Sequence, residues 1–227
     1  MNKCCQVCSR SSFPHVILYG VSAQTAQARK EATRDAILDA AFERFTLAGY
    51  RQTSMEDIAT ASGISRAAVY LHFSNKERIF RTLSERIQDR HLREAEEAVG
   101  LDAPVEERLH RVLKAKLDTF MEVVQSSPHG AELLDENSRI AGDISQAGRT
   151  RFLRTLKRLV EDAAERGELA PERSVVTAAA AAEIMLDWTR GLEVDAHSLS
   201  AHGYRRRVRD AARLLVAGLG GEPRRAD

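Results

Sequence analysis

The sequence has few cysteines, and all three lie within its first eight residues. Cys4, Cys5 and Cys8 have no fourth ligand at zinc-finger spacing, so we assign no metal to them. Because no cysteine follows Cys8, disulfides cannot crosslink the rest of the chain, which suits a reducing cytoplasm. We expect a cytoplasmic protein in which residues 1–28 form a disordered tail, unless a start codon assigned too early has added them.

The sequence also lacks an apolar run long enough to cross a membrane. Its longest nearly uncharged apolar stretch, residues 175–182, falls far short of the ~18 residues that a membrane helix needs. Residues 16–18 are apolar and follow Lys3 and Arg10, but this segment is too short for the core of a signal peptide. Membrane insertion and secretion are therefore not expected.

Motifs of common enzyme classes are missing as well. The chain contains no P-loop, no G-x-S-x-G and no H-E-x-x-H, and its seven histidines include no pair at metal-ligand spacing on one helix. We predict no catalytic residue, no cofactor and no metal. The net charge is only +1, so nucleic-acid binding requires a local basic patch. With 43% hydrophobic and 30% charged residues, the composition is that of a folded domain.

What the sequence does contain is helical periodicity from Arg29 onward, without a convincing strand. We predict an all-α fold with a small N-terminal domain (29–80), a larger helical domain (81–219) and a polar C-terminal tail (220–227). The expected helices span residues 32–47, 53–62, 66–72, a long helix from about residue 76, 104–125, one or two short helices within 131–147, and then 151–166, 171–192 and 202–217.

Two short helices between Thr53 and Phe73 have the pattern of a helix-turn-helix. Ala59 offers a small residue where the helices cross, Gly63 suits the turn, and Val69 anchors the second helix inward. Possible capping boxes precede the first helix (Thr53 with Glu56, or Ser54 with Asp57) and the long helix (Ser74 with Glu77). The second helix then exposes its other face, which fits the ~12 Å wide major groove of DNA.

This segment resembles the N-terminal domain of the TetR family of transcriptional regulators over about residues 34–80. The matching residues are Ile37, Ala40-Ala41, Phe45, Gly49, Thr53, Asp57-Ile58-Ala59, Gly63-Ile64-Ser65, Val69-Tyr70, His72-Phe73 and Lys76-Glu77. The resemblance implies a homodimeric regulator that binds a palindromic double-stranded operator and is released by a small-molecule effector. A ligand-responsive repressor is our first hypothesis, whereas an enzyme and an interaction module that keeps the helix-turn-helix only for packing are the alternatives.

Residue roles follow from chemistry together with this resemblance. Arg66 is expected to contact a base edge, since a guanidinium can bond guanine O6 and N7 together. Residues 62–81 hold four basic residues against one acidic residue, a net charge of +3. This modest patch makes a dimer necessary for tight binding. The complete set of predicted DNA-binding residues is Thr53, Ser54, Ser65, Arg66, Ala67, Ala68, Tyr70, His72 and Lys76. Among these, the two alanines are expected near a thymine methyl, and Tyr70, His72 and Lys76 at phosphates, although Tyr70 also suits a half-buried packing role.

For the larger domain the resemblance is architectural only, so no family residue is transferred to it. An effector pocket is expected between the helices at 104–125 and 151–166, and a dimer interface on the last two helices, with ordinary intrachain core as the alternative in both cases. The predicted pocket residues are Asp118, Phe120, Met121 and Trp188. The predicted interface residues are Ala181, Met185, Trp188, Val208, Ala212 and Leu215.

Overall fold

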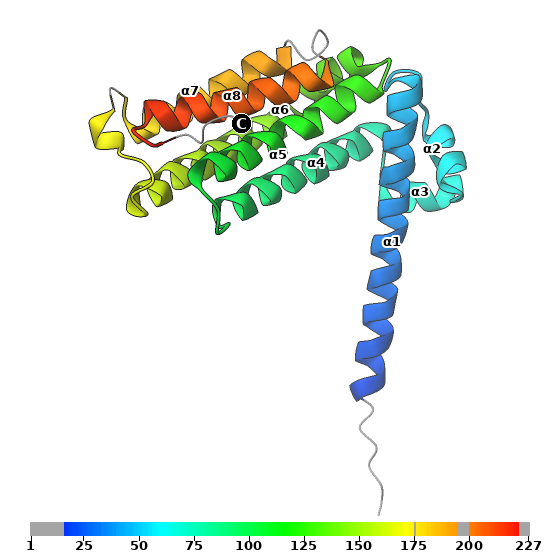
Figure 1. Ribbon diagram of the computed structural model, residues 1–227. Coiled ribbons are helices and arrows are strands. Elements are labelled where there is room, and N and C mark those ends of the chain that lie inside the picture. The colour runs from blue at the N-terminus through cyan, green and yellow to red at the C-terminus, as the bar shows by residue number, and fades with distance from the viewer. Residues whose placement is uncertain (1–15, 175, 195–199, 223–227) are drawn as a thin grey trace, which may run out of the picture.

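The computed structural model describes residues 16–174, 176–194 and 200–222, and within them every regular element is helical (Figure 1). The predicted all-α fold is confirmed. The elements are α1 (Val16–Ala48), α2 (Met55–Ser62), α3 (Arg66–His72), α4 (Lys76–Val99), α5 (Val105–Ser126), α6 (Gly130–Glu165), the 3-10 turn η1 (Pro171–Arg173), α7 (Ala178–Val194) and α8 (Ala201–Gly218). None of the described helices is long and apolar enough to cross a membrane.

The small N-terminal domain consists of α1, α2, α3 and the start of α4. Its core is centred on three aromatic rings, with centroids 5.3 Å apart for Phe45 and Tyr50, 5.7 Å for Phe45 and Phe80, and 5.1 Å for Tyr50 and Phe80. Ile58 and Val69 bring α2 and α3 onto this cluster and are fully buried. Since Phe80 belongs to α4, the small domain shares its core with the first helix of the larger one.

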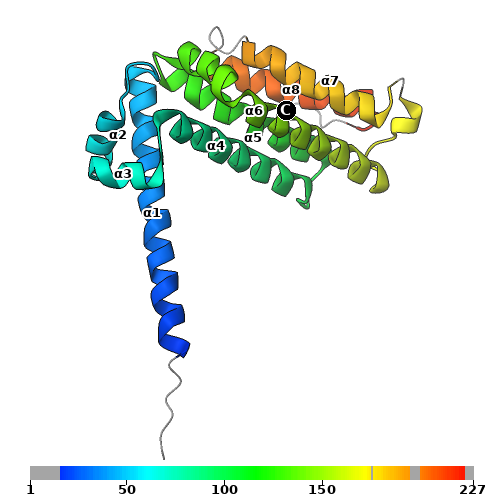
Figure 2. The same cartoon turned by 180° about the vertical axis from the view of Figure 1, so that it is seen from behind.

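In the larger domain, α5 and α6 pack against α4, while α7 and α8 pack on α5 and α6 from the other side (Figures 1 and 2). The core contains an ion-pair network as well as apolar side chains. Arg108 is completely buried, and its guanidinium bonds Asp162 at 2.5 Å, Glu168 at 2.6 Å and the Val99 carbonyl at 3.1 Å. This network joins the start of α5 to the end of α6 and the residues that follow it.

Helix α1 is longer than predicted. It begins at Val16, so residues 16–28, which we expected in a disordered tail, are helical here (Figure 1). Residues 25–32 are exposed, and the segment has alanine, glutamine, lysine and arginine but no apolar stripe. The prediction relied on that stripe and therefore missed a helix supported by propensity and by local bonds such as Gln27 to Glu31 at 2.6 Å. The predictions for Cys4, Cys5 and Cys8 lie outside the described residues.

Three further boundaries differ from the predictions. Residues 130–165 form one helix with a kink at Ala141 (φ −129°, ψ 25°) rather than separate short helices, because packing of α6 against α4 outweighs its glycines. The helix predicted to start at Pro171 is instead η1 followed by α7, since Ser174 between them is extended. Helix α4 is capped by Asn75, whose side chain accepts from the Arg78 amide at 2.7 Å, and not by Ser74.

Candidate functional site

The turn between α2 and α3 is fixed by side-chain caps at both helix starts. Ser54 and Asp57 form the capping box of α2, with Ser54 N donating to Asp57 at 2.8 Å and Asp57 N donating to Ser54 Oγ at 3.1 Å. These hydrogen bonds lower the pKa of Asp57. Gly63 ends α2 with φ 67°, a conformation that favours glycine. Ser65 then caps α3 by accepting from the Ala68 amide at 3.3 Å.

One side of α3 is held against the small-domain core, and the other side faces outward. Val69 is fully buried, and the Arg34 guanidinium lies over the Phe73 ring just after the helix, 4.7 Å from its centroid. The outward side carries Ser65, Arg66 and Ala67, all exposed, together with Tyr70, which is 44% exposed. Ala68 and His72 lie half-buried at the edges of this face. We call residues 65–68 and 70–72 the outer face of α3.

Arg66 extends from the outer face of α3 into solvent. Its side chain is 62% exposed, pairs with Glu56 at 3.3 Å and lies over the Tyr70 ring at 5.8 Å from the centroid. A solvent-exposed ion pair of this kind is worth at most about 1 kcal/mol. The guanidinium can therefore exchange Glu56 for an external acceptor at little cost.

Leu71 is the exposed residue of α3 that sequence reasoning missed. Its side chain is 85% exposed, more than any other large hydrophobic side chain in the described part of the chain. The signal was available, since position 71 lies about 200° around the helix from the buried position 69. An apolar side chain kept in water on this face suits contact with an apolar group such as a thymine methyl.

Two predicted DNA-contacting residues face the protein interior instead. Thr53 is only 2% exposed, and its hydroxyl donates to the Gly49 carbonyl at 2.7 Å, so it closes the loop between α1 and α2. The Lys76 ammonium donates to the carbonyls of Tyr50 at 2.7 Å, Thr53 at 2.7 Å and Arg51 at 3.3 Å, and lies 4.3 Å from the centre of the Tyr50 ring. These bonds occupy all three of its protons, and burial lowers its pKa. Lys76, one of the residues that carry the resemblance to the TetR family, therefore holds this loop in place.

We expect Lys76→Met to lower the free energy of unfolding by about 1–3 kcal/mol, because three loop carbonyls lose their donor. The salt dependence of DNA binding should keep its slope, since no phosphate contact is removed. Urea titration and binding at several salt concentrations measure the two quantities. Arg78→Met, which removes a neighbouring exposed cation, is the stability control. If the variant is as stable as wild type and the slope of its salt dependence falls by about one, Lys76 contacts a DNA phosphate.

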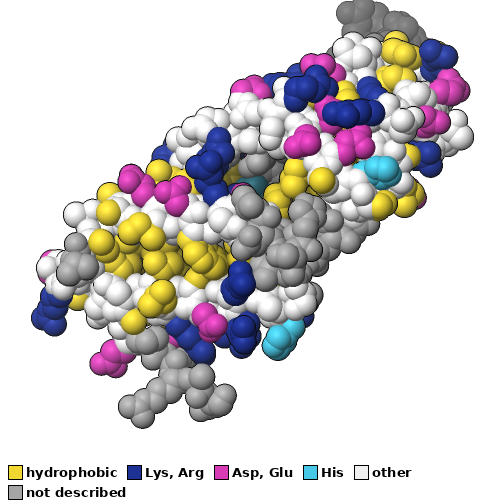
Figure 3. Space-filling view, turned by 90° about the horizontal axis from the view of Figure 1, so that it is seen from above, with side chains coloured by type: hydrophobic (Ala, Val, Ile, Leu, Met, Phe, Trp, Pro, Cys, Tyr) yellow, Lys and Arg dark blue, Asp and Glu magenta, His cyan; other side chains and the backbone are white. Residues whose placement is uncertain are grey.

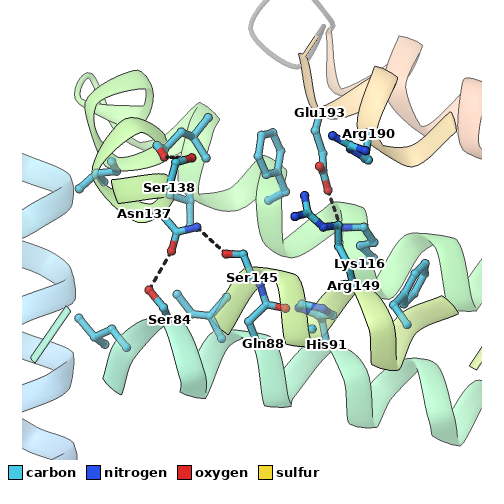
Figure 4. Close-up of a pocket in the computed structure, with 18 of the residues that line it drawn as sticks. Ser84, Gln88, His91, Lys116, Asn137, Ser138, Ser145, Arg149, Arg190 and Glu193 are labelled. Atoms are coloured by element: carbon cyan, nitrogen blue, oxygen red, sulfur yellow. Dashed lines mark hydrogen bonds and ion pairs between the residues drawn. The ribbon is translucent and has the colours of Figure 1, made fainter. Parts of the chain in front are cut away.

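A cavity of about 640 Å³ lies where the small domain meets the larger one (Figure 4). Its volume is in the range of pockets for drug-sized ligands. Apolar side chains of α1, α4 and α5 line it together with polar side chains of α4, α6 and α7. Ser84 donates to Asn137 at 2.9 Å and Asn137 donates to Ser145 at 3.0 Å, which links α4 to both sides of the α6 kink. The kink at Ala141 therefore borders this cavity.

Only Phe120 among the four predicted pocket residues lines the cavity. Lys116, Phe120 and Val123 share the face of α5 that lines it, at i, i+4 and i+7 spacing. Asp118 lies on another face and accepts a hydrogen bond from the Tyr204 hydroxyl at 3.1 Å. Met121 is buried in the core of the larger domain and Trp188 packs against that core, and neither lines this cavity.

His91 sits in the cavity wall as a neutral group. It is 5% exposed, and its pKa is lowered to about 4, chiefly by burial and in part by the charges of Lys116, Arg90 and Arg151. Nearby, Lys116 donates to Glu193 at 2.6 Å (Figure 4). The wall thus combines neutral polar groups with charged ones at neutral pH.

The first half of α6 also holds the small domain. Arg51 bonds Glu136 at 2.9 Å through its side chain and Glu132 at 2.9 Å through its backbone amide, and Arg81 bonds Asp143 at 2.7 Å. Burial raises the pKa of Glu136, but hydrogen bonds from Arg139 and Arg51 outweigh it and lower the pKa overall. The same stretch of α6 therefore contacts both the cavity and the loop that precedes α2.

Four predicted interface residues are buried within the single chain. Ala181, Met185, Val208 and Ala212 are between 0 and 2% exposed and belong to the core of the larger domain, so they do not form a surface. Small residues allow close helix approach, and here they serve packing inside the chain. Trp188 and Leu215 are partly buried against the same core. The large apolar side chains that α7 and α8 do expose are Ile184 at 50% and Leu214 at 73%.

Comparisons with known proteins point to one family. Residues 37–83 match the family described as bacterial regulatory proteins, tetR family. The chain is 30% identical over 149 residues to the HTH-type transcriptional repressor ComR of Escherichia coli (strain K12), covering 63% of this chain and 70% of ComR. It is 28% identical over 139 residues to the HTH-type transcriptional regulator YhgD of Bacillus subtilis (strain 168), with 60% and 71% covered. The crystal structure of the TetR family regulator PfmR from Thermus thermophilus superposes with a TM-score of 0.59 at 26% identity, covering 81% of this chain and 98% of PfmR.

Proposed function

Because this chain belongs to the TetR family of DNA-binding transcriptional regulators, we propose that it is a ligand-responsive repressor that binds a palindromic operator as a homodimer. The observation that carries the proposal is the outer face of α3. A helix anchored by Val69 on one side and exposing Arg66, Ala67, Tyr70 and Leu71 on the other has the form of a major-groove reader.

The residues of this face divide into base readers and backbone contacts. Arg66 reads a guanine, and Ala67, Ala68 and Leu71 contact a thymine methyl or allow close approach. Tyr70 and His72 hold phosphates through their polar ends. Ser65 and Ser54 lie exposed at the starts of α3 and α2, where hydroxyls and free amides suit phosphate oxygens. Thr53 and Lys76 position the loop from inside.

The outward surface of α7 and α8 supports a homodimer. It exposes Ile184 and Leu214, and Figure 3 looks down on this side of the molecule, where hydrophobic side chains gather. A two-fold arrangement places the same patch of each chain against its copy, so two exposed apolar side chains per chain become four. Both helices lie on the side of α5 and α6 opposite α4 (Figure 1).

The cavity supports ligand control of DNA binding. Phe42 and Phe45 of α1 line it, so a bound molecule touches the small domain directly. Leu133 and Asn137 of α6 line it too, on the stretch bonded to Arg51. A ligand that fits one placement of these helices better than the other shifts the protein away from the DNA-binding state.

Selection from random duplex DNA by the purified protein at moderate salt tests the proposal. We expect enrichment of a palindromic or quasi-palindromic site whose half-site centres lie one helical turn or a multiple of it apart. No enrichment of any sequence would favour an interaction module that keeps the helix-turn-helix for packing. Enrichment of a single half-site would refute the homodimer while retaining DNA binding.

On the selected operator, Arg66→Ala should cost about 1–3 kcal/mol and relax the preference at one base pair in each half-site. The reason is that a bidentate contact to guanine O6 and N7 is lost while α3 itself is unaffected. Repeating the selection with the variant reads out the preference, and thermal unfolding confirms the fold. A uniform loss across all sequences would assign Arg66 to the backbone instead of the bases.

A further inference from the structure

The cavity between the two domains has an apolar end and a charged end. Phe42 and Phe45 of α1 and Phe80 of α4 line the end beside the small domain. In Figure 4 the charged side chains Lys116, Arg149, Arg190 and Glu193 gather at the end away from α1. A ligand that fills the cavity therefore meets aromatic and other apolar side chains beside the small domain. At the other end it meets charged groups, with the Phe152 ring 5.7 Å from the Lys116 ammonium.

The charges at that end are not balanced. Among the described side chains that line the cavity there are three cations and two carboxylates. Glu193 is held by Lys116 at 2.6 Å, and Asp187 lies 3.9 Å from Arg190. Arg149 donates to the neutral amide oxygen of Gln146 from Nε at 3.1 Å and also from Nη2, and no carboxylate among the described side chains pairs with it. Among the described side chains of the cavity, the uncompensated charge is thus positive and belongs to Arg149.

Arg149 is a suitable group to receive an anion. It is half-buried, so an ion pair there is screened less than one in open water. Gln146 occupies the edge formed by Nε and Nη2, so the edge formed by Nη1 and Nη2 is the one that can bond a carboxylate, sulfonate or phosphate through two N–H groups. His91 lies neutral in the same wall, with neighbouring cations adding to the effect of its burial, which is consistent with positive potential at this end.

We propose that this cavity binds an amphiphile that has an apolar, partly aromatic body and one anionic head group, with the head at Arg149 and the body among the phenylalanines. The inference rests on the proposed function, in which the same cavity holds the molecule that controls DNA binding. It specifies the ligand class and the residue that selects it.

Two fluorescent probes with one aromatic body test the class. 1-Anilinonaphthalene-8-sulfonate carries an anionic head, whereas N-phenyl-1-naphthylamine lacks it. We expect the sulfonate to bind the wild-type chain at least about tenfold more tightly than the neutral probe. Arg149→Gln should weaken binding of the sulfonate about tenfold and leave the affinity for the neutral probe unchanged. Arg154→Gln, which neutralises an exposed cation on the same helix outside the cavity, should change neither.

A blocking variant shows whether the probes enter the cavity. A Cβ at Gly148 would lie 2.3 Å from Oε1 of Gln88, a flexible side chain that lines the cavity. Gly148→Leu therefore fills part of the cavity and should weaken the binding of both probes. An unchanged sulfonate affinity in this variant would place the probe elsewhere and contradict the proposal. The thermal midpoint of each variant shows that the fold is retained.

Any of three results would overturn the ligand class. These are equal affinity for the two probes, a sulfonate affinity that Arg149→Gln does not change, or tighter binding of the hydrophobic cation ethidium than of the sulfonate. These failures are distinct from failure of the proposed function, because operator selection needs no ligand. A chain that selects an operator but shows no preference for the sulfonate has another ligand class. If the probes bind as expected but no operator is selected, the proposed ligand site stands and the proposed regulatory role is refuted.

Discussion

Arg108→Met is expected to lower the free energy of unfolding by about 3–5 kcal/mol, because Glu168 loses the buried cation and Asp162 keeps only its ion pair with the more exposed Arg166. The Arg108 side chain is fully buried, whereas those of Asp162 and Glu168 are 32% and 25% exposed. Glu168 also accepts from the Val105 amide at 2.5 Å, so the start of α5 depends on the same network. Because methionine replaces the aliphatic part of the Arg108 side chain, the loss of stability measures the contribution of the guanidinium. Urea unfolding followed by circular dichroism measures it.

The effect of Arg108→Met should depend on pH in a defined direction. The hydrogen bond from Arg108 outweighs burial and lowers the pKa of Asp162. A lowered folded-state pKa means that this stabilisation is present above the unfolded value of about 3.9 and is lost as pH falls through the folded value. The stability difference between wild type and variant should therefore shrink below about pH 4, as Asp162 becomes protonated in both proteins.

Arg111→Met is the matched control for this prediction. Arg111 lies one turn along α5, is 52% exposed and pairs with Glu107 at 2.6 Å in an i, i+4 arrangement. Such a pair contributes about 0.3–0.5 kcal/mol, so its loss should be close to the error of the measurement. If Arg108→Met were as stable as wild type, the buried network would be replaceable by an apolar side chain, as happens in some proteins.

The small domain was predictable from sequence because its signals are local. Ala59, Gly63 and Val69 each have a role that spacing along the chain defines, and the structure buries Ala59 and Val69 and ends α2 at Gly63. Lys76 shows the limit of such patterns. Its position in the chain was clear, but whether its ammonium faces DNA or the carbonyls of the preceding loop depends on a tertiary contact.

The larger domain was less predictable because several of its helices have two plausible inner faces. Alanines and larger apolar residues occur all around α7, so periodicity could not tell the side that packs on α6 from the side that faces outward. Met185 lies inside while Ile184, its neighbour, is 50% exposed. A buried Arg108 was likewise unpredictable, since a charge is buried only where partners from distant segments meet it, here Asp162 and Glu168.

Leu214→Glu is expected to convert the proposed homodimer to a monomer and to weaken operator binding by about 10²–10⁴-fold. Leu214 is 73% exposed on α8, so the substitution costs little in the separate chain. At a two-fold interface every substitution occurs twice, and it places two carboxylates in an apolar contact without partners. A monomer then loses the effective concentration that links one half-site to the other. Sedimentation equilibrium measures the mass, and titration of a labelled operator measures the affinity.

Ile184→Glu should reproduce this result from α7, because Ile184 is the other large apolar side chain exposed among the described residues of these two helices. Leu47→Glu is the control for mass, since Leu47 is 58% exposed but belongs to α1 and not to α7 or α8. A dimer that survives both Leu214→Glu and Ile184→Glu would show that the chains associate through another face. Loss of operator affinity without loss of the dimer would instead show that the outward surface of α7 and α8 acts on the spacing of the two α3 helices, since the interface sets how far apart they lie.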